Sequence, residues 1–438
     1  MGRKRAYAPL DVYMNTRRVG QYFREPDGAF GFTYAPEWLA WENTLPISRA
    51  LPLRPERYTG PPVIAVFENL LPDSDMIRRS VAERVGADGV DAYSLLARIG
   101  RDCVGALQFL PEGEAPGDAR ALTGEPLSEE QISEMLRDLA QTPLGIRAEQ
   151  DFRISVAGAQ EKTALLFQDH QWLLPTGTTP TTHILKPAIG RLPNGMDLTD
   201  SIENEHFCLR LLAGFDLPVA HTKIGNFAGT RALVIERFDR LRARDGRLIR
   251  LPQEDCCQAL SVPPTRKYQN EGGPGIVEIC GLLTGSDEPL RDRSSFLKAV
   301  ILFWLIGATD GHAKNFSIAL MPGGRFTMTP IYDVLTVQPS LDAGTLQIKD
   351  MKLAMRAGKI RHYRVADIHG RHFVETGLAA GFSRELVAGV FDDILGRAAQ
   401  AFEGAAAEMP PGFPDGLAAS VRRGFEQRVA RIGTRVEE

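Results

Sequence analysis

The longest apolar stretch of the chain runs from Ala299 to Ala308. It is about half the length that spans a lipid bilayer as a helix, so we expect no membrane segment. An apolar run with no polar face predicts instead a helix buried on every side. The polar segment Thr309–Asn315 follows it directly. A rigid buried element should therefore hold that polar segment in a fixed place.

Length and composition are those of an ordinary globular protein. The 438 residues are 43% apolar and 24% charged, and a chain this long forms two or three domains. The net charge of -4 argues against a chain that wraps nucleic acid through bulk charge. Five cysteines without disulfide or zinc spacing, and no apolar signal segment after Met1, predict a cytoplasmic protein.

A helix should close the first part of the chain. Ser128 and Gln131 have the spacing of a capping box, in which each side chain bonds the other residue's backbone. The apolar residues behind them share one helix face. They are Ile132, Met135, Leu136 and Leu139. We place a domain boundary close to residue 150.

Alternating apolar and polar residues after this boundary predict an antiparallel sheet. Its expected strands are residues 152–156, 163–167, 171–174, 181–186 and 232–235. A helix capped by Asp200, with Glu203 in its first turn, should interrupt them. After residue 251 the pattern is mainly helical. This order predicts an α+β, protein-kinase-like bilobal fold. Residues 1–150 form a small mixed N-terminal subdomain, 151–250 an antiparallel-sheet N-lobe, and 251–438 a helical C-lobe.

The segment Thr309–Asn315 carries the strongest chemical signal. Asp310 and Asn315 are five positions apart, as are the base and the metal-binding Asn of the kinase loop H-R-D-x-x-x-x-N. The carboxylate must accept a proton from the attacking hydroxyl while the amide oxygen reaches magnesium. Taken alone, the spacing also fits a polar turn at a helix end.

A second acid supports the metal site. Residues 316–320 and 326–329 flank a Pro-Gly-Gly turn and predict a β-hairpin. The hairpin would return the chain so that Asp333 lies beside the Asp310 loop. Magnesium prefers one or two carboxylates together with substrate phosphates. The alternative is that Asp333 only caps a turn.

Two further segments could bind ATP. A turn between two expected strands has small residues at its centre, which lets backbone N–H groups approach phosphates, although an ordinary hairpin turn has the same composition. Its candidate ligands are Val156, Ala157, Gly158, Ala159, Gln160 and Lys162. The segment Glu236–Asp239 follows a strand and would be the interlobe hinge, or else an unspecific connection. Phe238 belongs to it, and Asp239 could accept from a ribose hydroxyl.

Lys186 ends a strand, where kinases place the lysine that binds phosphates. Glu205 lies on the same helical stripe as Ile202, Leu209 and Leu212, which predicts that it faces inward. A buried carboxylate needs a partner, and Lys186 is the natural one. Alternatively, Glu205 lies partly exposed at the edge of the stripe.

Two charged segments are interpreted as structural. Leu251–Asp255 should begin a helix, with acids in the first turn. The C-terminal arginines should form a solvated helix face. They are Arg422, Arg423, Arg428, Arg431 and Arg435.

Long motifs make the sequence resemble HipA, the kinase toxin of a bacterial toxin–antitoxin pair. The matching strings are spread along nearly the whole length of the chain. They are Phe67–Asp73, Asp151–Thr163, Glu236–Arg240, Leu251–Asp255 and Trp304–Phe316. The chain lacks the G-x-G-x-x-G, H-R-D and D-F-G motifs of ordinary protein kinases. The geometry of the phosphate loop and the mode of activation are therefore left open.

The resemblance implies roles for individual residues. Asp310 resembles the catalytic Asp, and Asn315 and Asp333 resemble the magnesium ligands. Lys186 resembles the ATP lysine, and Glu236 and Phe238 the adenine-binding hinge. His312 and Lys314, within the same motif as Asp310, are assigned to the nucleotide site. Ser155 resembles a serine that such kinases phosphorylate on themselves to switch off, which agrees with the cost of adding negative charge beside a triphosphate.

The resemblance also implies partners. The substrate would be an aminoacyl-tRNA synthetase, typically the glutamyl enzyme, whose phosphorylation halts translation and promotes persistence. A HipB-like helix-turn-helix antitoxin would neutralise the chain and recruit it to operator DNA. Two other functions remain open: a small-molecule phosphotransferase, and a catalytically silent corepressor that only clamps the antitoxin.

Overall fold

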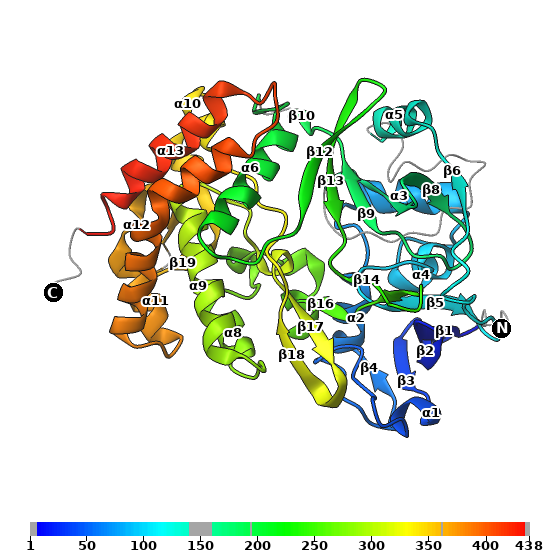
Figure 1. Cartoon of the computed structure of the whole chain (residues 1–438). Coiled ribbons are helices and arrows are strands. Elements are labelled where there is room, and N and C mark those ends of the chain that lie inside the picture. Colours follow the sequence, from blue (N-terminus) through cyan, green and yellow to red (C-terminus); the bar gives the residue numbers. More distant parts are fainter. Residues whose placement is uncertain (1–6, 140–159, 193–194, 361, 434–438) are drawn as a thin grey trace. The chain divides into compact units, whose positions relative to one another are not determined.

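The computed structural model describes residues 7–139, 160–192, 195–360 and 362–433 (Figure 1). The chain forms two compact units. Unit 1 comprises Met1–Pro187, Gly225–Thr265 and Ile318–Phe326, and unit 2 comprises Ala188–Ile224, Arg266–Ser317 and Thr327–Glu438. The expected division at residues 150 and 250 remains a prediction.

Unit 1 begins with a five-stranded antiparallel sheet in the order β4-β3-β2-β1-β5. The strands are β1 Leu10–Met14, β2 Arg17–Arg24, β3 Phe30–Tyr34, β4 Tyr58–Thr59 and β5 Leu107–Pro111. Four helices accompany it, α1 Pro36–Leu39, α2 Pro61–Glu68, α3 Asp75–Val85 and α4 Ala92–Ile99. The core between sheet and helices is aromatic: the ring of Tyr22 stacks on Phe67 at 4.1 Å, and Phe109 meets both rings edge-on.

A second sheet has the order β12-β13-β9-β7-β8-β6. Its strands are β6 Gly124–Pro126, β7 Thr163–Gln168, β8 Gln171–Pro175, β9 His183–Lys186, β12 Thr222–Phe227 and β13 Thr230–Glu236. The predicted meander is confirmed. Asp169 and His170 make the turn between β7 and β8 with positive φ angles of 49° and 63°, the backbone twist that tight hairpins require. The expected strand at 152–156 lies outside the described residues.

Helix α5 (Glu129–Asp138) covers part of this sheet. The predicted capping box is confirmed, because Ser128 Oγ accepts from the Gln131 amide and Gln131 Oε1 accepts from the Ser128 amide. The four apolar residues predicted to share a face are buried against the apolar side chains of β7, β9, β12 and β13. Local sequence therefore fixes both the start and the buried face of this helix.

Short elements complete unit 1. Strands β14 (Arg240–Arg242) and β15 (Leu248–Arg250) pair with each other, and β16 (Gln253–Asp255) leads into α7 (Cys256–Ala259). Asp255 caps α7, but Glu254 lies in β16 and is 1% exposed. The prediction that both acids occupy a first helical turn is therefore wrong for Glu254. Burial raises the pKa of the Glu254 carboxyl to about 8.

Unit 2 is mainly helical. Its α-helices are α6 Ser201–Gly214, α8 Ile276–Leu283, α9 Pro289–Ile306, α10 Gln338–Asp342, α11 Gly370–Ala379, α12 Arg384–Ala407 and α13 Asp415–Val429. Two strand pairs are also present, β10 Gly190–Arg191 with β11 Asp197–Leu198, and β19 Lys352–Ala357 with β20 His362–Arg364. The antiparallel sheets and the helical unit confirm the α+β class.

Helix α9 is the centre of unit 2 and packs against α8, α12 and α13 (Figure 1). Every residue from Phe296 to Ile306 is buried, which confirms the helix predicted from the apolar stretch. Within the described residues, no helix is both long and apolar enough to cross a membrane.

Two capping and exposure predictions fail in unit 2. Helix α6 begins after Asp200 as expected, but the Asp200 side chain makes no capping bond among the described residues. Arg428 of α13 is 4% exposed and donates to the carbonyl of Leu305 and to Gln338. The prediction of a solvated arginine face is therefore wrong for Arg428, while Arg435 lies outside the described residues.

Candidate active site

The loop after α9 is held from several distant segments of unit 2. Helix α9 ends at Ile306, and its C-cap residue Gly307 has a φ of 75°, in the left-handed region that glycine adopts without strain. The last carbonyls of a helix have no partner within it and must find one elsewhere. Here the carbonyl of Leu305 accepts from the Arg428 side chain, that of Ile306 from Thr336 Oγ1, and that of Gly307 from the Val337 amide.

The loop itself is closed by backbone bonds. The amide of His312 donates to the carbonyl of Asp310 at 2.8 Å, and the amide of Asn315 donates to the carbonyl of His312 at 2.9 Å. Gly311 leaves room for Phe303, because a Cβ at Gly311 would come within 2.4 Å of that ring. The segment Thr309–Asn315 is therefore a compact turn with one preferred path, as the buried helix before it predicted.

Asp310 is exposed and is held by a tyrosine. The hydroxyl of Tyr268 donates to Asp310 Oδ1 at 2.5 Å. The Tyr268 ring in turn meets the His312 ring edge-on, with 5.0 Å between the ring centroids. The bond occupies one carboxylate oxygen of Asp310 and orients the other.

Asn315 and Asp333 lie together, as the hairpin predicted. Strands β17 (Ser317–Met321) and β18 (Arg325–Met328) are neighbours in a three-stranded sheet with β16. Asn315 Nδ2 donates to the backbone carbonyl of Asp333 at 3.2 Å, so the amide oxygen of Asn315 points away from that carbonyl. Asp333 has a φ of 59°, which is uncommon outside glycine and is often found at functional sites.

These two residues fit a magnesium ion. An amide oxygen and a carboxylate are hard oxygen ligands, and a magnesium site with few protein ligands takes the remaining ones from water and phosphate. Within the described ranges, no group of three or more His, Cys, Asp and Glu side chains could hold a metal. The amide oxygen of Asn315 and the carboxylate of Asp333 suit a metal that arrives with a phosphate substrate.

His312 and Lys314 are both buried, at 5% and 7% exposure. The carbonyl of Lys314 accepts from the hydroxyl of Tyr332, which also bonds Ser317. These contacts fix the loop and the start of β17 to each other. The assignment of His312 and Lys314 to the nucleotide remains a prediction.

Glu205 is 3% exposed, which confirms that it faces inward and excludes the partly exposed alternative. Its neighbour Asn204 bonds both backbone groups of Thr336: Nδ2 donates to the carbonyl and Oδ1 accepts from the amide. Helix α6 is thereby tied to the chain that follows Asp333. Lys186 ends β9 in unit 1 and is 4% exposed. Its pairing with Glu205 remains a prediction.

The phosphate-binding turn is described only in part. Ser155, Val156, Ala157, Gly158 and Ala159 lie outside the described residues. Gln160 Nε2 donates to the carbonyl of Pro187 at 3.2 Å, next to Lys186. Lys162 is buried directly before β7. Their contact with phosphate remains a prediction.

The hinge prediction needs one correction. Glu236 ends β13 with an exposed side chain, and Phe238 is half-buried, so both remain candidates. Asp239, in contrast, is 4% exposed, and its carboxylate accepts from Arg237, Arg240, Gln253 and the amide of Gly105. These arginines lower the pKa of Asp239 to about 2 although burial alone would raise it. The prediction that Asp239 binds a ribose hydroxyl is wrong, because its oxygens are already used.

Sequence reasoning missed three residues that position this site: Tyr268, Asn204 and Arg428. Each acts on a residue far away in the chain, and each lies in a segment without a motif of its own. Asn204 stands beside Glu205 on a stripe of buried residues, and a buried asparagine is a signal for such a clamp. No local signal indicates Tyr268.

An exposed Asp after a buried helix, an Asn five residues later and a second Asp beside that Asn are the arrangement typical of phosphotransferases with a protein-kinase-like fold. Comparisons with known proteins narrow this class. The family profile described as "HipA-like C-terminal domain" matches residues 154–402, and the profile "HipA N-terminal domain" matches residues 10–110.

Relatives extend over most of the chain. The protein Y4mE of Sinorhizobium fredii (strain NBRC 101917 / NGR234), whose name describes it as a kinase, is 39% identical over 354 residues, which are 80% of this chain and 81% of that protein. The "Serine/threonine-protein kinase toxin HipA" of Shewanella oneidensis is 26% identical over 341 residues, 75% of each protein. The chain belongs to the HipA family of kinase toxins.

A solved structure confirms the fold. It is the Shewanella oneidensis MR-1 toxin–antitoxin complex of HipA, HipB and operator DNA. One of its chains matches with a TM-score of 0.78 and 24% identity, over 96% of this chain and 96% of that chain. The predicted kinase-like α+β fold is therefore correct.

Proposed function

We propose that the chain is an ATP-dependent serine/threonine protein kinase with Asp310 as its catalytic carboxylate. The observation that carries this proposal is the arrangement around the Asp310 loop: Tyr268 holds Asp310, and Asn315 is bonded to the backbone of Asp333. A scaffold without catalysis has no need for this arrangement. Membership of a family with kinase-named relatives supports it.

Each residue has a distinct role in the proposed reaction. Asp310 Oδ2, the oxygen not bonded by Tyr268, accepts the hydrogen of the substrate hydroxyl and aligns its oxygen with the γ-phosphorus of ATP. Asn315 and Asp333 would hold magnesium, which neutralises charge on the phosphates when bound. Lys186, with Glu205 as its partner, stabilises the same negative charge from a side chain. Positioning and electrostatics supply most of the catalysis.

The remaining nucleotide contacts belong to this proposal as well. Gln160, Lys162, His312 and Lys314 would contact phosphate, and the Glu236–Phe238 segment would bind adenine. Autophosphorylation of Ser155 would switch the enzyme off, because a phosphoserine adds nearly two negative charges close to a triphosphate. Mass spectrometry of peptides after incubation with ATP and magnesium tests the Ser155 assignment directly.

The proposed partners follow the family. The substrate is an aminoacyl-tRNA synthetase, with the glutamyl enzyme as first candidate, and its phosphorylation arrests growth. A HipB-like helix-turn-helix antitoxin neutralises the chain and links it to operator DNA in the cytoplasm. The Shewanella oneidensis HipA was solved in a complex of this composition, which supports the proposal.

The test compares Asp310→Asn with Asp350→Asn, an exposed acid elsewhere in unit 2. The purified proteins are incubated with γ-labelled ATP, magnesium and a bacterial lysate. We expect Asp310→Asn to lower phosphotransfer about 10²–10⁴-fold, the usual contribution of a general base, and Asp350→Asn to keep it. Full activity of Asp310→Asn would refute the assignment.

The same assay separates the alternatives. Label on a protein band supports a protein kinase, whereas label only in small molecules supports a small-molecule phosphotransferase. Nucleotide binding without transfer of label from the wild-type chain would indicate a silent corepressor. The glutamyl-tRNA synthetase candidate is tested by adding the purified enzyme in place of the lysate.

A further inference from the structure

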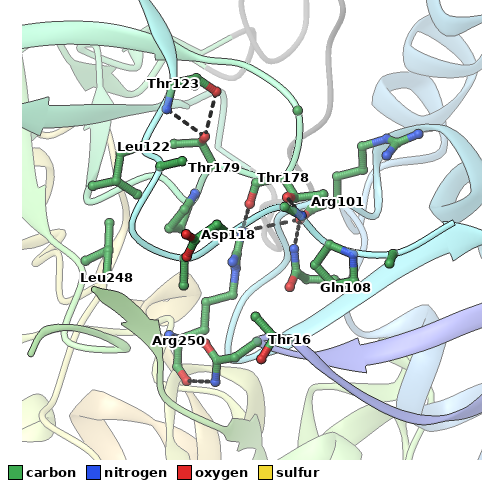
Figure 2. A pocket seen from close by; sticks show the side chains of 18 residues that line it. Thr16, Arg101, Gln108, Asp118, Leu122, Thr123, Thr178, Thr179, Leu248 and Arg250 are labelled. Atoms are coloured by element: carbon green, nitrogen blue, oxygen red, sulfur yellow. Dashed lines mark hydrogen bonds between the residues drawn. The ribbon is translucent and has the colours of Figure 1, made fainter. Parts of the chain in front are cut away.

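Unit 1 contains a cavity of about 370 Å³ that the proposed kinase reaction does not use (Figure 2). The turn between β1 and β2, strand β5, two loops around residues 115–123 and 177–180, and strand β15 line it. None of the residues assigned to ATP or magnesium belongs to the lining. Its size is at the lower end of small-molecule sites, roughly 300–1,000 Å³.

A buried charged cluster adjoins this cavity, because Arg250 belongs to both. Three guanidiniums, of Arg237, Arg240 and Arg250, surround two carboxylates, of Asp102 and Asp239, and no side chain of the five is more than 5% exposed. Burial lowers the pKa of Arg240 to about 10, so the group stays charged at neutral pH. The cluster therefore carries one positive charge that no acid within it neutralises.

Arg250 extends from this cluster to the cavity. Its Nε donates to Asp102, and the terminal nitrogen Nη2 donates to the carbonyls of Thr178 and Arg101. The hydrogen bonds of the Arg250 side chain to the described residues use Nε and Nη2 and not Nη1, and Arg250 lines the cavity. A guanidinium N–H without a partner at the wall of a cavity suits an anionic oxygen.

Gln108 supplies a hydrogen-bond acceptor, whereas Arg250 supplies a donor. Its side chain lines the cavity and is fully buried, and its Nε2 donates to the carbonyl of Arg101 at 3.1 Å. Its Oε1 accepts no hydrogen bond from any described residue. Buried acceptors are almost always satisfied, so this oxygen calls for a donor from a molecule in the cavity. Figure 2 shows the Gln108 and Arg250 side chains around the same space.

We propose that this cavity binds a small hydroxylated anion, a phosphate monoester of a polyol, with its anionic oxygens on Arg250 and a hydroxyl donating to Gln108. The rim favours the same charge, because Arg101 lies there and its acid partner within the described residues is the exposed Glu114 at 3.0 Å. Asp118, also on the rim, opposes it. The ligand would satisfy the free acceptor and the excess positive charge together.

The test uses the full-length protein and glycerol 3-phosphate as the probe. Calorimetric titration gives its dissociation constant at low ionic strength, where charge effects are least screened. Glycerol (hydroxyls without charge) and sulfate (charge without a donor) are the controls. We expect glycerol 3-phosphate to bind at least tenfold more tightly than either. Equal binding of sulfate would overturn the proposal. The absence of heat from glycerol 3-phosphate up to about 10 mM, a concentration at which even a weak metabolite site is occupied, would also overturn it.

Variants that change the charge near the rim test whether the cavity selects anions. They should leave the fold intact, because these side chains are at least partly exposed. Asp118→Asn and Glu114→Gln should each tighten binding of glycerol 3-phosphate by roughly two- to fivefold, the size of one partly screened charge contact, and Arg101→Gln should weaken it by a similar factor. Unchanged affinity in all three variants would contradict the proposed charge preference.

Gln108→Met tests the hydroxyl contact. It removes the acceptor and keeps a side chain of similar length, so the variant should lose the preference for glycerol 3-phosphate over sulfate. Its thermal midpoint without ligand should fall only slightly, because the Nε2 donor to the Arg101 carbonyl is lost although no satisfied acceptor is. A variant with this midpoint and an intact preference for glycerol 3-phosphate would exclude Gln108 from the site.

Discussion

Replacing Asp102 with Asn should destabilise unit 1 strongly, because Asp102 is the acid that holds three buried arginines. Its Oδ1 accepts from Arg240 at 2.9 Å and from Arg250 at 3.0 Å, and its Oδ2 lies 3.4 Å from Arg237. Oδ2 also accepts from the amide and hydroxyl of Thr181 at 3.0 and 2.7 Å. The acid is therefore saturated on both oxygens.

The size of this loss of stability follows from the hydrogen bonds that an asparagine side chain can still accept. Asn retains one oxygen, so whichever way it turns, its NH2 group faces either two guanidiniums or the two donors of Thr181. The cluster also gains a second uncompensated positive charge. Removing one partner of a buried ionic group costs about 3–5 kcal/mol, and a domain's whole free energy of unfolding is about 5–15 kcal/mol. Asp102→Asn should thus remove about a fifth or more of the stability of unit 1.

Urea unfolding followed by tryptophan fluorescence measures this loss. Three of the four tryptophans, Trp38, Trp41 and Trp172, lie in unit 1 and report on it. The matched control is Asp245→Asn, which breaks the exposed ion pair with Arg247 and should leave the unfolding midpoint unchanged.

The pH dependence of urea unfolding tests whether the loss of stability comes from the missing negative charge of Asp102. The arginines hold the pKa of Asp102 well below its usual value against the opposing effect of burial, which is the larger single influence. A carboxyl whose pKa is depressed on folding stabilises above its unfolded pKa, about 3.9, and loses that contribution as the pH falls through the folded value. The difference between wild type and Asp102→Asn should be constant from pH 5 to 8 and should narrow below about pH 4. Equal midpoints at pH 7, or a difference independent of pH down to 2, would refute the reasoning.

Three further predictions concern single residues. Burial raises the pKa of Glu254 to about 8, so wild type should lose stability between pH 5 and 8 as the unfolded chain ionises, and Glu254→Gln should flatten this slope in urea titrations at several pH values. Tyr268→Phe removes the donor to Asp310 and should lower turnover roughly tenfold with an unchanged KM for ATP; a raised KM alone would contradict a positioning role. Arg428→Met should lower the free energy of unfolding of unit 2 by about 2–4 kcal/mol, measured by the fluorescence of Trp304, because it leaves the carbonyl of Leu305 without its donor.

Features that depend on neighbouring residues could be predicted from the sequence. The capping box at Ser128 and Gln131, the hairpin around residues 321–324 and the buried helix before Asp310 each follow from contacts within a few positions. The turn shape of the loop Thr309–Asn315 belongs to this group, because its backbone bonds join residues two and three positions apart, whereas its place in unit 2 depends on distant segments. The same local information placed Glu205 on the inner face of α6.

Features that depend on distant partners could not be predicted. Asp239 stands in a hinge-like motif, but Gly105, 134 positions earlier, donates to its carboxylate, and burial follows from that contact. Arg428 resembles its arginine neighbours in sequence and differs only because a helix end 123 positions away lacks a donor. Residue type and spacing carry no information on such pairings, since any surface arginine would have satisfied the same pattern.

The end of α9 shows how these distant contacts serve the candidate site. The helix delivers Asp310, yet the carbonyls of its last turn are satisfied by Arg428 of α13 and by Thr336 and Val337 of the chain after Asp333. Thr336 is in turn fixed by Asn204 of α6. Every one of these segments must be folded before the loop has its final position. A helix that carries no proposed site residue, α13, therefore contributes to the placement of the catalytic carboxylate, and changes there should act on phosphotransfer through the geometry of the loop.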